Sequence, residues 1–211
     1  MLKISGFIAR QVWFKNVKPN TYHGATTSIA YMSTASTPKK LANRVALVTG
    51  STEGIGFAVA KRLAEDGAKV VVCSRKQQNV DRAVNELEAE FPNQVAGLVC
   101  HVGKNEDRTR IVDFTLERFG SIDILVNNAA TYAGYVGPFV DMEESKWDEV
   151  FEVNLKAPFL LTQQVVPHMM KNNKGGDKGA IIYVSSVAGY NGYSQIGAYS
   201  VSKTALLGLC A

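Results

Sequence analysis

Short apolar runs rich in β-branched residues alternate with amphipathic stretches from residue 44 onward, at intervals of about 25 residues. The runs that predict strands are RVALVT (44–49), KVVVCS (69–74), QVAGLVC (94–100), IDILVNNAA (122–130) and GAIIYVSS (179–186). The stretches between them predict helices, with Gly67 and Gly120 as stop signals, one helix over 79–91 and a long one over 143–171. This alternation predicts an α/β fold in which a doubly wound parallel sheet carries helices on both faces.

The first predicted strand leads into TGSTEGIG, with glycines at positions 50, 54 and 56, and then into a predicted helix. Glycines at such a turn let the backbone approach a pyrophosphate, and the first amides of the helix supply donors at the positive end of its dipole. The spacing is G-x-x-x-G-x-G. A glycine turn without a ligand is the alternative, and the flanking strand and helix argue against it.

The second predicted strand ends in Ser74, Arg75 and Lys76. An acidic residue at this place would hydrogen-bond the adenosine ribose of NAD, whereas the planar guanidinium of Arg75 suits the 2′-phosphate of NADP. Glu53 in the glycine turn argues the other way, because its negative charge would repel a phosphate. Arg75 stands where the ribose must lie, so the sequence favours NADP(H).

Three further features fall where ligands bind in such folds, at the carboxyl edge of the sheet. Asn127 and Asn128 either hold neighbouring strands together and border the cofactor, or are ordinary turn residues. The loop TYAGYVGPFVDM (131–142) is predicted to line part of a substrate pocket. Asn154 is a polar amide on an apolar helix face, which suggests a bound water or an unusual carbonyl, and Pro158 removes the N–H that would bond the Asn154 carbonyl.

The stretch SVAGYNGYSQIGAYSVSK (186–203) holds a serine after the fifth strand and a Tyr-x-x-x-Lys pair. Tyr199 and Lys203 are four residues apart, so they share a helix face, and a neighbouring positive charge favours the ionised form of a phenol. Tyr199 can then give or take a proton. Such a pair alone is usually a solvated face. Its position after the glycine turn, the two asparagines and Ser186 favours catalysis.

Composition limits the class of protein. At 211 residues and 46% hydrophobic, the chain suits one globular domain, and no apolar run is long enough to span a bilayer. The net charge of +4 combines +7 from residues 1–52 with −3 from the remainder, which argues against a nucleic-acid binder. Cys73, Cys100 and Cys210 follow no metal or redox spacing and are predicted to be reduced thiols of an intracellular protein.

Residues 1–40 are basic, rich in Ser and Thr, and free of acidic residues, with scattered apolar positions that could form one amphipathic face. This composition is typical of a mitochondrial transit peptide. A disordered tail, or a true start at Met32, explains it equally well. In each case the segment is predicted to take no part in the fold.

With these motifs in order, residues 42–211 resemble the short-chain dehydrogenase/reductase family. More closely, CSRKQQNVDRAV, CHVGKNEDR and VSKTALLGL are similar to its member 4 group of NADPH-dependent carbonyl and retinal reductases. The resemblance implies a Rossmann-type sheet and hydride transfer from NADP(H) to a ketone, dicarbonyl or retinal, with no metal. It also implies a small-molecule carbonyl substrate as the partner and a homo-oligomer for the full-length family.

The resemblance implies four catalytic residues. Ser186 would hydrogen-bond the substrate carbonyl, Tyr199 would protonate the developing alkoxide, and Lys203 would favour tyrosinate and hold the nicotinamide ribose. Asn154 would position a proton-relay water. The residues that it implies for cofactor binding are Gly50, Ser51, Gly54, Ile55, Gly56, Ser74, Arg75, Val102, Asn127, Ala129, Tyr199 and Lys203.

The chain departs from the family pattern at two short motifs. Ala130 replaces the usual glycine after Asn-Asn-Ala, and His101 replaces the usual aspartate that contacts adenine. His101 either donates a hydrogen bond there or caps the strand. The member 4 group resembles this chain in the acidic residue before the second glycine of the turn, which eases the objection to Glu53.

The sequence stops at Ala211, eight residues after Lys203, whereas family members continue with two more strands and much of the substrate pocket and subunit interface. We therefore expect an incomplete domain with an exposed edge and apolar face, for which an oligomer is doubtful. A truncated, non-catalytic isoform that binds a dinucleotide, or a product that does not fold, are the alternatives to a reductase. The organelle stays open between mitochondrion, peroxisome and cytosol.

Overall fold

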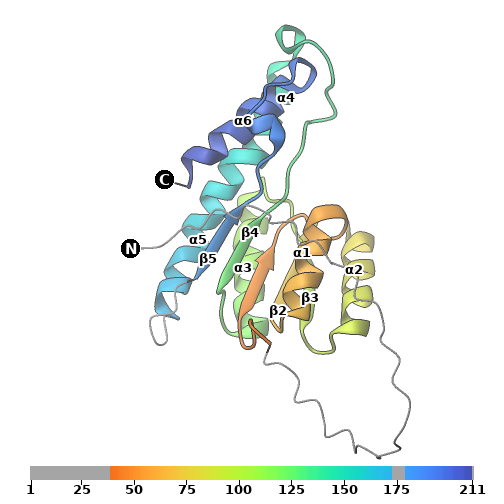
Figure 1. The fold of residues 1–211 in the computed structure, drawn as a ribbon, viewed down its shortest axis with the longest axis vertical. Coiled ribbons are helices and arrows are strands. Elements are labelled where there is room, and N and C mark those ends of the chain that lie inside the picture. The colour runs from red at the N-terminus through yellow and green to blue at the C-terminus, as the bar shows by residue number, and fades with distance from the viewer. Residues whose placement is uncertain (1–38, 173–178, 211) are drawn as a thin grey trace, which may run out of the picture.

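The computed structural model describes residues 39–172 and 179–210, which form a five-stranded parallel sheet with helices on both faces (Figure 1). The strands are β1 (Val45–Val48), β2 (Lys69–Ser74), β3 (Val95–Val99), β4 (Ile124–Asn127) and β5 (Ala180–Tyr183). The helices are α1 (Gly54–Glu65), α2 (Gln77–Glu90), α3 (Asn105–Phe119), α4 (Glu144–Phe151), α5 (Ala157–Lys171) and α6 (Gly197–Gly208). A π-helical turn, η2 (Glu152–Lys156), joins α4 to α5.

The strand order is β3-β2-β1-β4-β5, with every neighbouring pair parallel. In the central register, Leu47 of β1 lies between Val71 of β2 and Leu125 of β4. The order reverses its direction between β1 and β4, and ligands bind at such a switch point in open α/β sheets. The predicted doubly wound parallel fold is confirmed.

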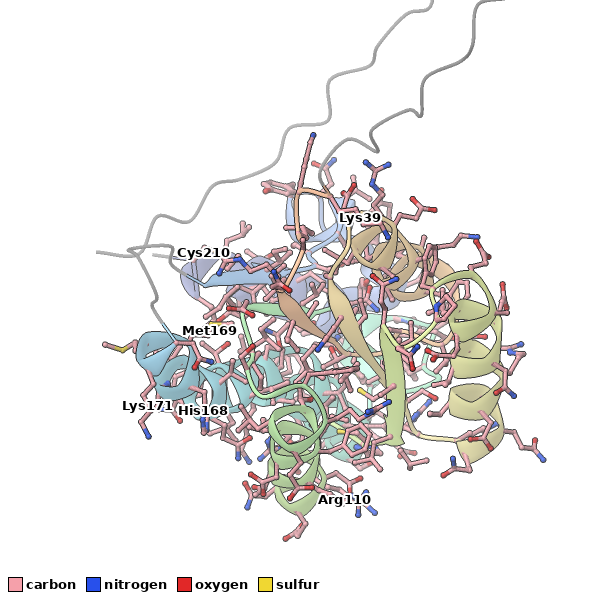
Figure 2. All side chains as sticks on the ribbon, turned by 90° about the horizontal axis from the view of Figure 1, so that it is seen from below. Lys39, Arg110, His168, Met169, Lys171 and Cys210 are labelled. Atoms are coloured by element: carbon pink, nitrogen blue, oxygen red, sulfur yellow. The ribbon has the colours of Figure 1, made fainter. Side chains whose placement is uncertain are left out.

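Two apolar layers cover the sheet because successive strand residues point to opposite faces. Leu47, Val71 and Leu125 pack toward α3 and α5, whereas Ala46 and Val48 pack toward α1 and α2. Seen from below, Arg110 on α3 and Met169 on α5 lie on one side of the sheet (Figure 2). These two layers hold the carboxyl ends of the strands, and with them the polar residues that follow each strand, in fixed positions.

The predicted stop signals end helices through left-handed glycines. Gly67, with φ of +99°, follows α1, and Gly120, with φ of +81°, is the C-cap of α3. A residue with a Cβ is strained in this conformation. The sequence therefore predicted these two helix ends for the correct physical reason.

Strand β5 is the least covered strand of the sheet. Its burial alternates between exposed and half-buried residues, and Ile182 is 46% exposed. By contrast, all residues of β1 and β4 are buried. The exposed apolar edge expected for this end of the sheet is present in the described residues.

The predicted leader falls almost entirely outside the described residues. Within the described part, the backbone N–H of Leu41 donates to the carbonyl oxygen of Asp66 across 2.8 Å. The Leu41 side chain packs against the apolar layer between the sheet and helices α1 and α2. The folded region therefore includes a few residues before position 42. No helix in residues 39–172 or 179–210 has the length and apolar character needed to cross a membrane.

Candidate active site

The glycine turn between β1 and α1 is shaped by two left-handed glycines and one crowded glycine. Gly50 and Gly54 have φ values of +59° and +58°, which favour glycine. At Gly56, a Cβ would overlap the side-chain nitrogen of Asn128 and the carbonyl oxygen of Gly50. Glu53 precedes α1 without a side-chain cap, so its charge adds no capping bond to the first turn.

Asn128 and Thr49 tie this turn to the end of β4. Asn128 Nδ2 donates hydrogen bonds to the carbonyl oxygens of Thr49 (3.0 Å) and Gly50 (2.8 Å). Thr49 Oγ1 accepts from the backbone N–H groups of Asn128 and Ala129, both across 3.0 Å. Asn128 therefore holds neighbouring strands together as the sequence suggested. The side-chain nitrogen of the adjacent Asn127 is buried with no protein partner among the described residues.

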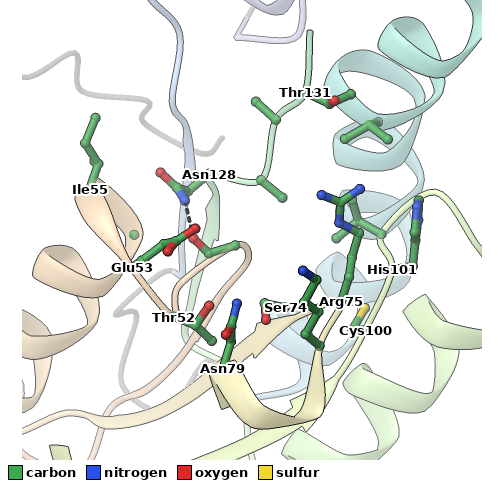
Figure 3. A pocket seen from close by; sticks show the side chains of 17 residues that line it. Thr52, Glu53, Ile55, Ser74, Arg75, Asn79, Cys100, His101, Asn128 and Thr131 are labelled. Atoms are coloured by element: carbon green, nitrogen blue, oxygen red, sulfur yellow. Dashed lines mark hydrogen bonds between the residues drawn. The ribbon is translucent and has the colours of Figure 1, made fainter. Parts of the chain in front are cut away.

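A cleft of about 440 Å³ opens at the carboxyl ends of the strands (Figure 3). Seven of the residues predicted to bind the cofactor line it: Gly50, Ile55, Gly56, Ser74, Arg75, Val102 and Ala129. Ser51, Gly54, Asn127, Tyr199 and Lys203 do not. Ser51 is fully buried. Its hydroxyl donates to Val48 O (2.6 Å) and accepts from Cys73 N (3.0 Å), so Ser51 links β1 to β2 and does not face the cleft.

One wall of the cleft is basic. Arg75 and Lys76 follow β2 and are exposed, and His101, which follows β3, lies beside Arg75 (Figure 3). Within the described residues neither Arg75 nor Lys76 forms a salt bridge. Glu53, also exposed, lies across the cleft at the glycine turn. The cleft therefore has a cationic wall with free donors, which suits an anionic group better than the glycine turn alone.

An unpaired buried hydroxyl is a further observation that fits a nucleotide cofactor in this cleft. The Ser74 hydroxyl is buried at the cleft and has no hydrogen-bond partner in the described residues. Buried polar atoms are nearly always paired, so an unpaired one at a binding cleft indicates a missing ligand or water. Together with the glycine turn and the cationic wall, the unpaired Ser74 hydroxyl fits a ligand that carries hydroxyl and phosphate groups.

His101 has a fixed hydrogen-bond role at this wall. Its Nδ1 accepts from the backbone N–H of Gly103 across 3.1 Å, and the backbone N–H of His101 donates to Asp107 Oδ2 across 2.8 Å. Neutral imidazole that accepts at Nδ1 carries its proton on Nε2. His101 therefore caps the end of β3, whereas donation of a ring hydrogen bond to adenine stays a prediction.

Tyr199 and Lys203 lie one turn apart on α6, as their spacing predicted. Lys203 Nζ lies 5.6 Å from the centroid of the Tyr199 ring and donates a 2.7 Å hydrogen bond to Val184 O. Lys203 is only 2% exposed, and this burial lowers its pKa to about 8. Lys203 is therefore a buried cation beside the Tyr199 ring that loses its charge as the pH rises through about 8.

The segment after β5 packs against this turn of α6. Ser185 Oγ donates to Lys203 O across 2.9 Å, and Thr204 Oγ1 donates to Gly189 O across 2.8 Å. A Cβ on Gly189 would come within 2.9 Å of Lys203 O, so glycine is required for this close approach. Ser186 lies between these anchors, and its hydroxyl accepts from Ala188 N across 3.2 Å. The structure thus brings the predicted serine segment to the Tyr-Lys helix.

The Asn154 side chain makes three hydrogen bonds within the protein, and its expected role in positioning a relay water stays a prediction. Its Oδ1 accepts from Thr131 N (2.8 Å), and its Nδ2 donates to Thr131 O (2.8 Å) and Ser202 Oγ (3.0 Å). Both amide hydrogens are used, so the side chain has no donor left to hold a relay water. The turn around it is π-helical, and Pro158 has no N–H to offer the Asn154 carbonyl. Any relay water would therefore bind the carbonyl.

A second hollow, of about 340 Å³, lies beside Tyr199. It is lined by Ala130, Thr131, Tyr132, Val136, Ile196 and Tyr199. Ala130 and Thr131 also line the larger cleft, so the two spaces adjoin at the end of β4. Thr131, Tyr132 and Val136 of the loop over residues 131–142 supply half of these lining residues, and the binding of a substrate there stays a prediction. Tyr199 therefore lines a mostly apolar pocket that adjoins the larger cleft.

Comparison with known families identifies this arrangement. A family model described as short chain dehydrogenase matches residues 44–211. The chain belongs to this family. It is 56% identical over 169 residues to dehydrogenase/reductase SDR family member 4 from Bos taurus, covering 80% of this chain and 58% of that relative. It is 50% identical over 190 residues to dehydrogenase/reductase SDR family member 2, mitochondrial, from Homo sapiens, covering 89% of this chain and 65% of that relative.

A solved structure supports the same assignment. The 3-ketoacyl-(acyl-carrier-protein) reductase from Brucella melitensis complexed with NADH has a TM-score of 0.75 and 28% identity, covering 80% of this chain and 68% of that one. The family is one of oxidoreductases, and the solved Brucella melitensis reductase is complexed with NADH. The chain spans less than two thirds of the length of the two curated relatives.

The sequence analysis did not identify several residues that line the cleft or hold Asn154 in place. Thr131 and Ser202 complete the Asn154 network, and Asn79 and Thr52 line the cleft. Ser202 stands between the tyrosine and the lysine, where its helix position could have indicated it. Thr131 has no such signal, because it acts through its backbone, which any residue could supply.

Proposed function

We propose that this short-chain dehydrogenase reduces the carbonyl group of a small molecule with NADPH, with Tyr199 as the general acid. The observation that carries the proposal is the position of Tyr199 in a pocket that adjoins the nucleotide cleft at Ala130 and Thr131. A substrate in that pocket would have its carbonyl near both the phenol and the cofactor. Ketones, dicarbonyls and retinal are the substrates implied by resemblance.

The chain's own residues would divide the chemistry as follows. When bound, the nicotinamide cofactor supplies the hydride. The Tyr199 hydroxyl donates a proton to the carbonyl oxygen as negative charge develops there, and the Lys203 ammonium stabilises the tyrosinate that remains. The Ser186 hydroxyl donates a hydrogen bond to the same oxygen. Asn154 keeps Thr131, which lines both spaces, in place against α6.

The preference for NADPH over NADH rests on the cationic wall. Arg75 offers a planar fork of donors that matches a phosphate, and Lys76 adds a second positive charge. The residues nearest to the predicted ribose position therefore attract the extra phosphate of NADPH. Glu53 is farther along the cleft at the glycine turn, where it weakens this attraction without cancelling it.

The test compares the 211-residue chain with its Tyr199→Phe variant. NADPH consumption is followed spectrophotometrically with a reactive dicarbonyl, and NADPH affinity is measured by fluorescence titration. We expect Tyr199→Phe to abolish turnover and to leave NADPH affinity unchanged. Equal loss of turnover and affinity would contradict the role of Tyr199.

A non-catalytic dinucleotide-binding protein is the second candidate. It is favoured by the exposed face of β5, where Ile182 is 46% exposed. NADPH binding with no turnover would support it. Turnover that appears only when the C-terminal third of a close relative is added would place the catalytic residues correctly but assign activity to a longer protein.

Assembly and location are further proposals. We propose a mitochondrial location, supported by the basic, acid-free N-terminal composition and by the mitochondrial name of the Homo sapiens relative. We also propose that a homo-oligomer requires the longer protein. Imaging of a fluorescent fusion and light scattering of the purified chain test these two points separately.

A further inference from the structure

The loop over residues 131–142, here called the pocket loop, meets the segment before α6 at the pocket of the proposed proton donor. The backbone N–H of Gly137 donates to Gln195 O across 2.9 Å. Val136 precedes this donor and Ile196 follows this acceptor, and both residues line the pocket. The hydrogen bond therefore limits how far apart two apolar lining residues from separate segments can move.

A second contact between the pocket loop and α6 depends on a glycine. Phe139 lies against Gly197, the first residue of α6. A Cβ on Gly197 would overlap Phe139 Cδ2 and come within 3.0 Å of Phe139 Cγ, and the three atoms nearest to it all belong to Phe139. Gly197 has an ordinary helical φ of −57°, which any residue adopts. The absence of a Cβ therefore serves the contact with Phe139, whereas the helix itself does not require glycine.

Aromatic rings of α4, which lies beside α6, also contact Phe139 (Figure 1). The Phe139 ring meets Trp147 edge-to-face with centroids 5.8 Å apart, and Trp147 stacks on Phe151 with centroids 4.2 Å apart. Such ring pairs stabilise beyond the area that they bury. Ala198, which directly precedes Tyr199, is buried in the same cluster as Trp147. The pocket loop is therefore packed against both α4 and the first turn of α6.

The pocket can select a substrate mainly by size. Among the described residues, no charged side chain lines this space of about 340 Å³. An apolar pocket separates related substrates by the volume that it admits. Val136 is 62% exposed, so burial of its own side chain does little to hold it. The position of Val136, and with it the width of the pocket, therefore depends on the neighbouring contacts of the pocket loop.

We propose that Phe139 and Gly197, here called the clamp, are specificity-determining residues that keep the pocket narrow and so favour small carbonyl compounds. A side chain at position 197 displaces the Phe139 ring from α6, and the pocket loop moves with it. The backbone hydrogen bond of the pocket loop then lengthens, and Val136 moves away from Ile196. The wider pocket admits bulkier groups next to the carbonyl. The specificity rests on the proposed function, whereas the contact within the clamp does not.

The test measures kcat/KM of the full chain with NADPH for two diketones, diacetyl and its bulkier diphenyl analogue benzil. Gly197→Ala should raise the benzil-to-diacetyl ratio about tenfold, the scale on which apolar pockets separate substrates by size. Phe139→Ala should also raise this ratio. The double variant should match Phe139→Ala, because the added Cβ then has no ring to displace. Gly208→Ala, at the other end of α6 with open space around it, is the matched control and should leave the ratio unchanged.

Trp147 reports on the clamp without any turnover, because Phe139 contacts its ring. The other tryptophan of the chain is Trp13, so in a Trp13→Phe background all tryptophan fluorescence comes from Trp147. In this background Gly197→Ala should move Phe139 away from Trp147 and increase quenching of the fluorescence by acrylamide. Gly208→Ala should leave the quenching unchanged.

Three outcomes would overturn the proposal. Unchanged quenching in Gly197→Ala would overturn the clamp, as would additive effects of the two substitutions on the substrate ratio. Increased quenching with an unchanged ratio would overturn the role in specificity. If the unsubstituted chain reduced neither diketone, the proposed function would fail and the specificity with it, while the quenching would still support or overturn the clamp.

Discussion

Asn154 donates a hydrogen bond from Nδ2 to Ser202 Oγ across 3.0 Å and so joins the π-helical turn to α6. Ser202 is fully buried, and its hydroxyl in turn donates to Tyr199 O across 2.7 Å. The same asparagine pairs with both backbone groups of Thr131. One amide therefore positions the pocket wall and the proposed proton donor relative to each other.

Ser202→Ala should reduce kcat more than it raises KM. The substitution leaves one buried Asn154 hydrogen and the Tyr199 carbonyl without this partner, which costs about 1–3 kcal/mol of stability. Steady-state kinetics with a dicarbonyl and thermal unfolding measure the two effects. Thr204→Ala is the control, because Thr204 bonds Ser200 O and Gly189 O on the same helix but does not contact Asn154. Equal kinetic effects of both variants would contradict the special role of Ser202.

Lys203 should make stability depend on pH in the alkaline range. Its pKa is about 8 in the folded chain and 10.5 as a free side chain, so burial of its charge destabilises the fold below pH 8. Between these values the folded state loses the proton while the unfolded state keeps it. The free energy of unfolding should therefore rise by up to about 3 kcal/mol as pH increases through this window.

The matched variant for this prediction is Lys203→Met, which keeps the aliphatic length and removes the charge. Denaturant unfolding at about pH 7 and about pH 10 gives the difference between the two proteins. The advantage of the methionine variant should shrink as pH rises. An advantage independent of pH would show that Lys203 does not titrate in this range.

Gly56→Ala should abolish dinucleotide binding. Its Cβ would overlap Asn128 Nδ2 and Gly50 O, so the glycine turn must open to accommodate it. The loss of the Asn128 hydrogen bonds should also lower stability by about 1–3 kcal/mol. Fluorescence titration with NADPH and thermal unfolding check both effects. Gly192→Ala, at a glycine with open space around it, should change neither quantity.

Arg75→Ala should lower NADPH affinity about 10- to 100-fold and leave NADH affinity nearly unchanged, because a charge-assisted hydrogen bond to a phosphate contributes about 1.5–3 kcal/mol. Titration with both cofactors gives the ratio. Arg118→Ala removes the same charge from the last turn of α3 and should alter neither affinity. A parallel loss for NADPH and NADH would mean that Arg75 does not recognise the 2′-phosphate.

Local rules made much of this fold predictable. Strand β2 has the bounds that its apolar run predicted, and Gly67 and Gly120 end helices through positive φ. Such features depend on neighbouring residues, so the chain displays them directly. The helix over 143–171 was predicted as continuous, but it contains a π-helical turn at Glu152–Lys156. That turn follows from Pro158 together with the contacts of Asn154, which no local pattern shows.

The sequence by itself determined the glycine turn, the order of strands and helices, and the face shared by Tyr199 and Lys203, because each depends on spacing within one element. Tertiary structure alone decided that the Asn154 side chain hydrogen-bonds Thr131 and Ser202, and that Lys203 donates to Val184 O. These partners lie on different elements. Their distances are set by packing of the sheet and helices, which forms only when the whole domain buries its apolar faces.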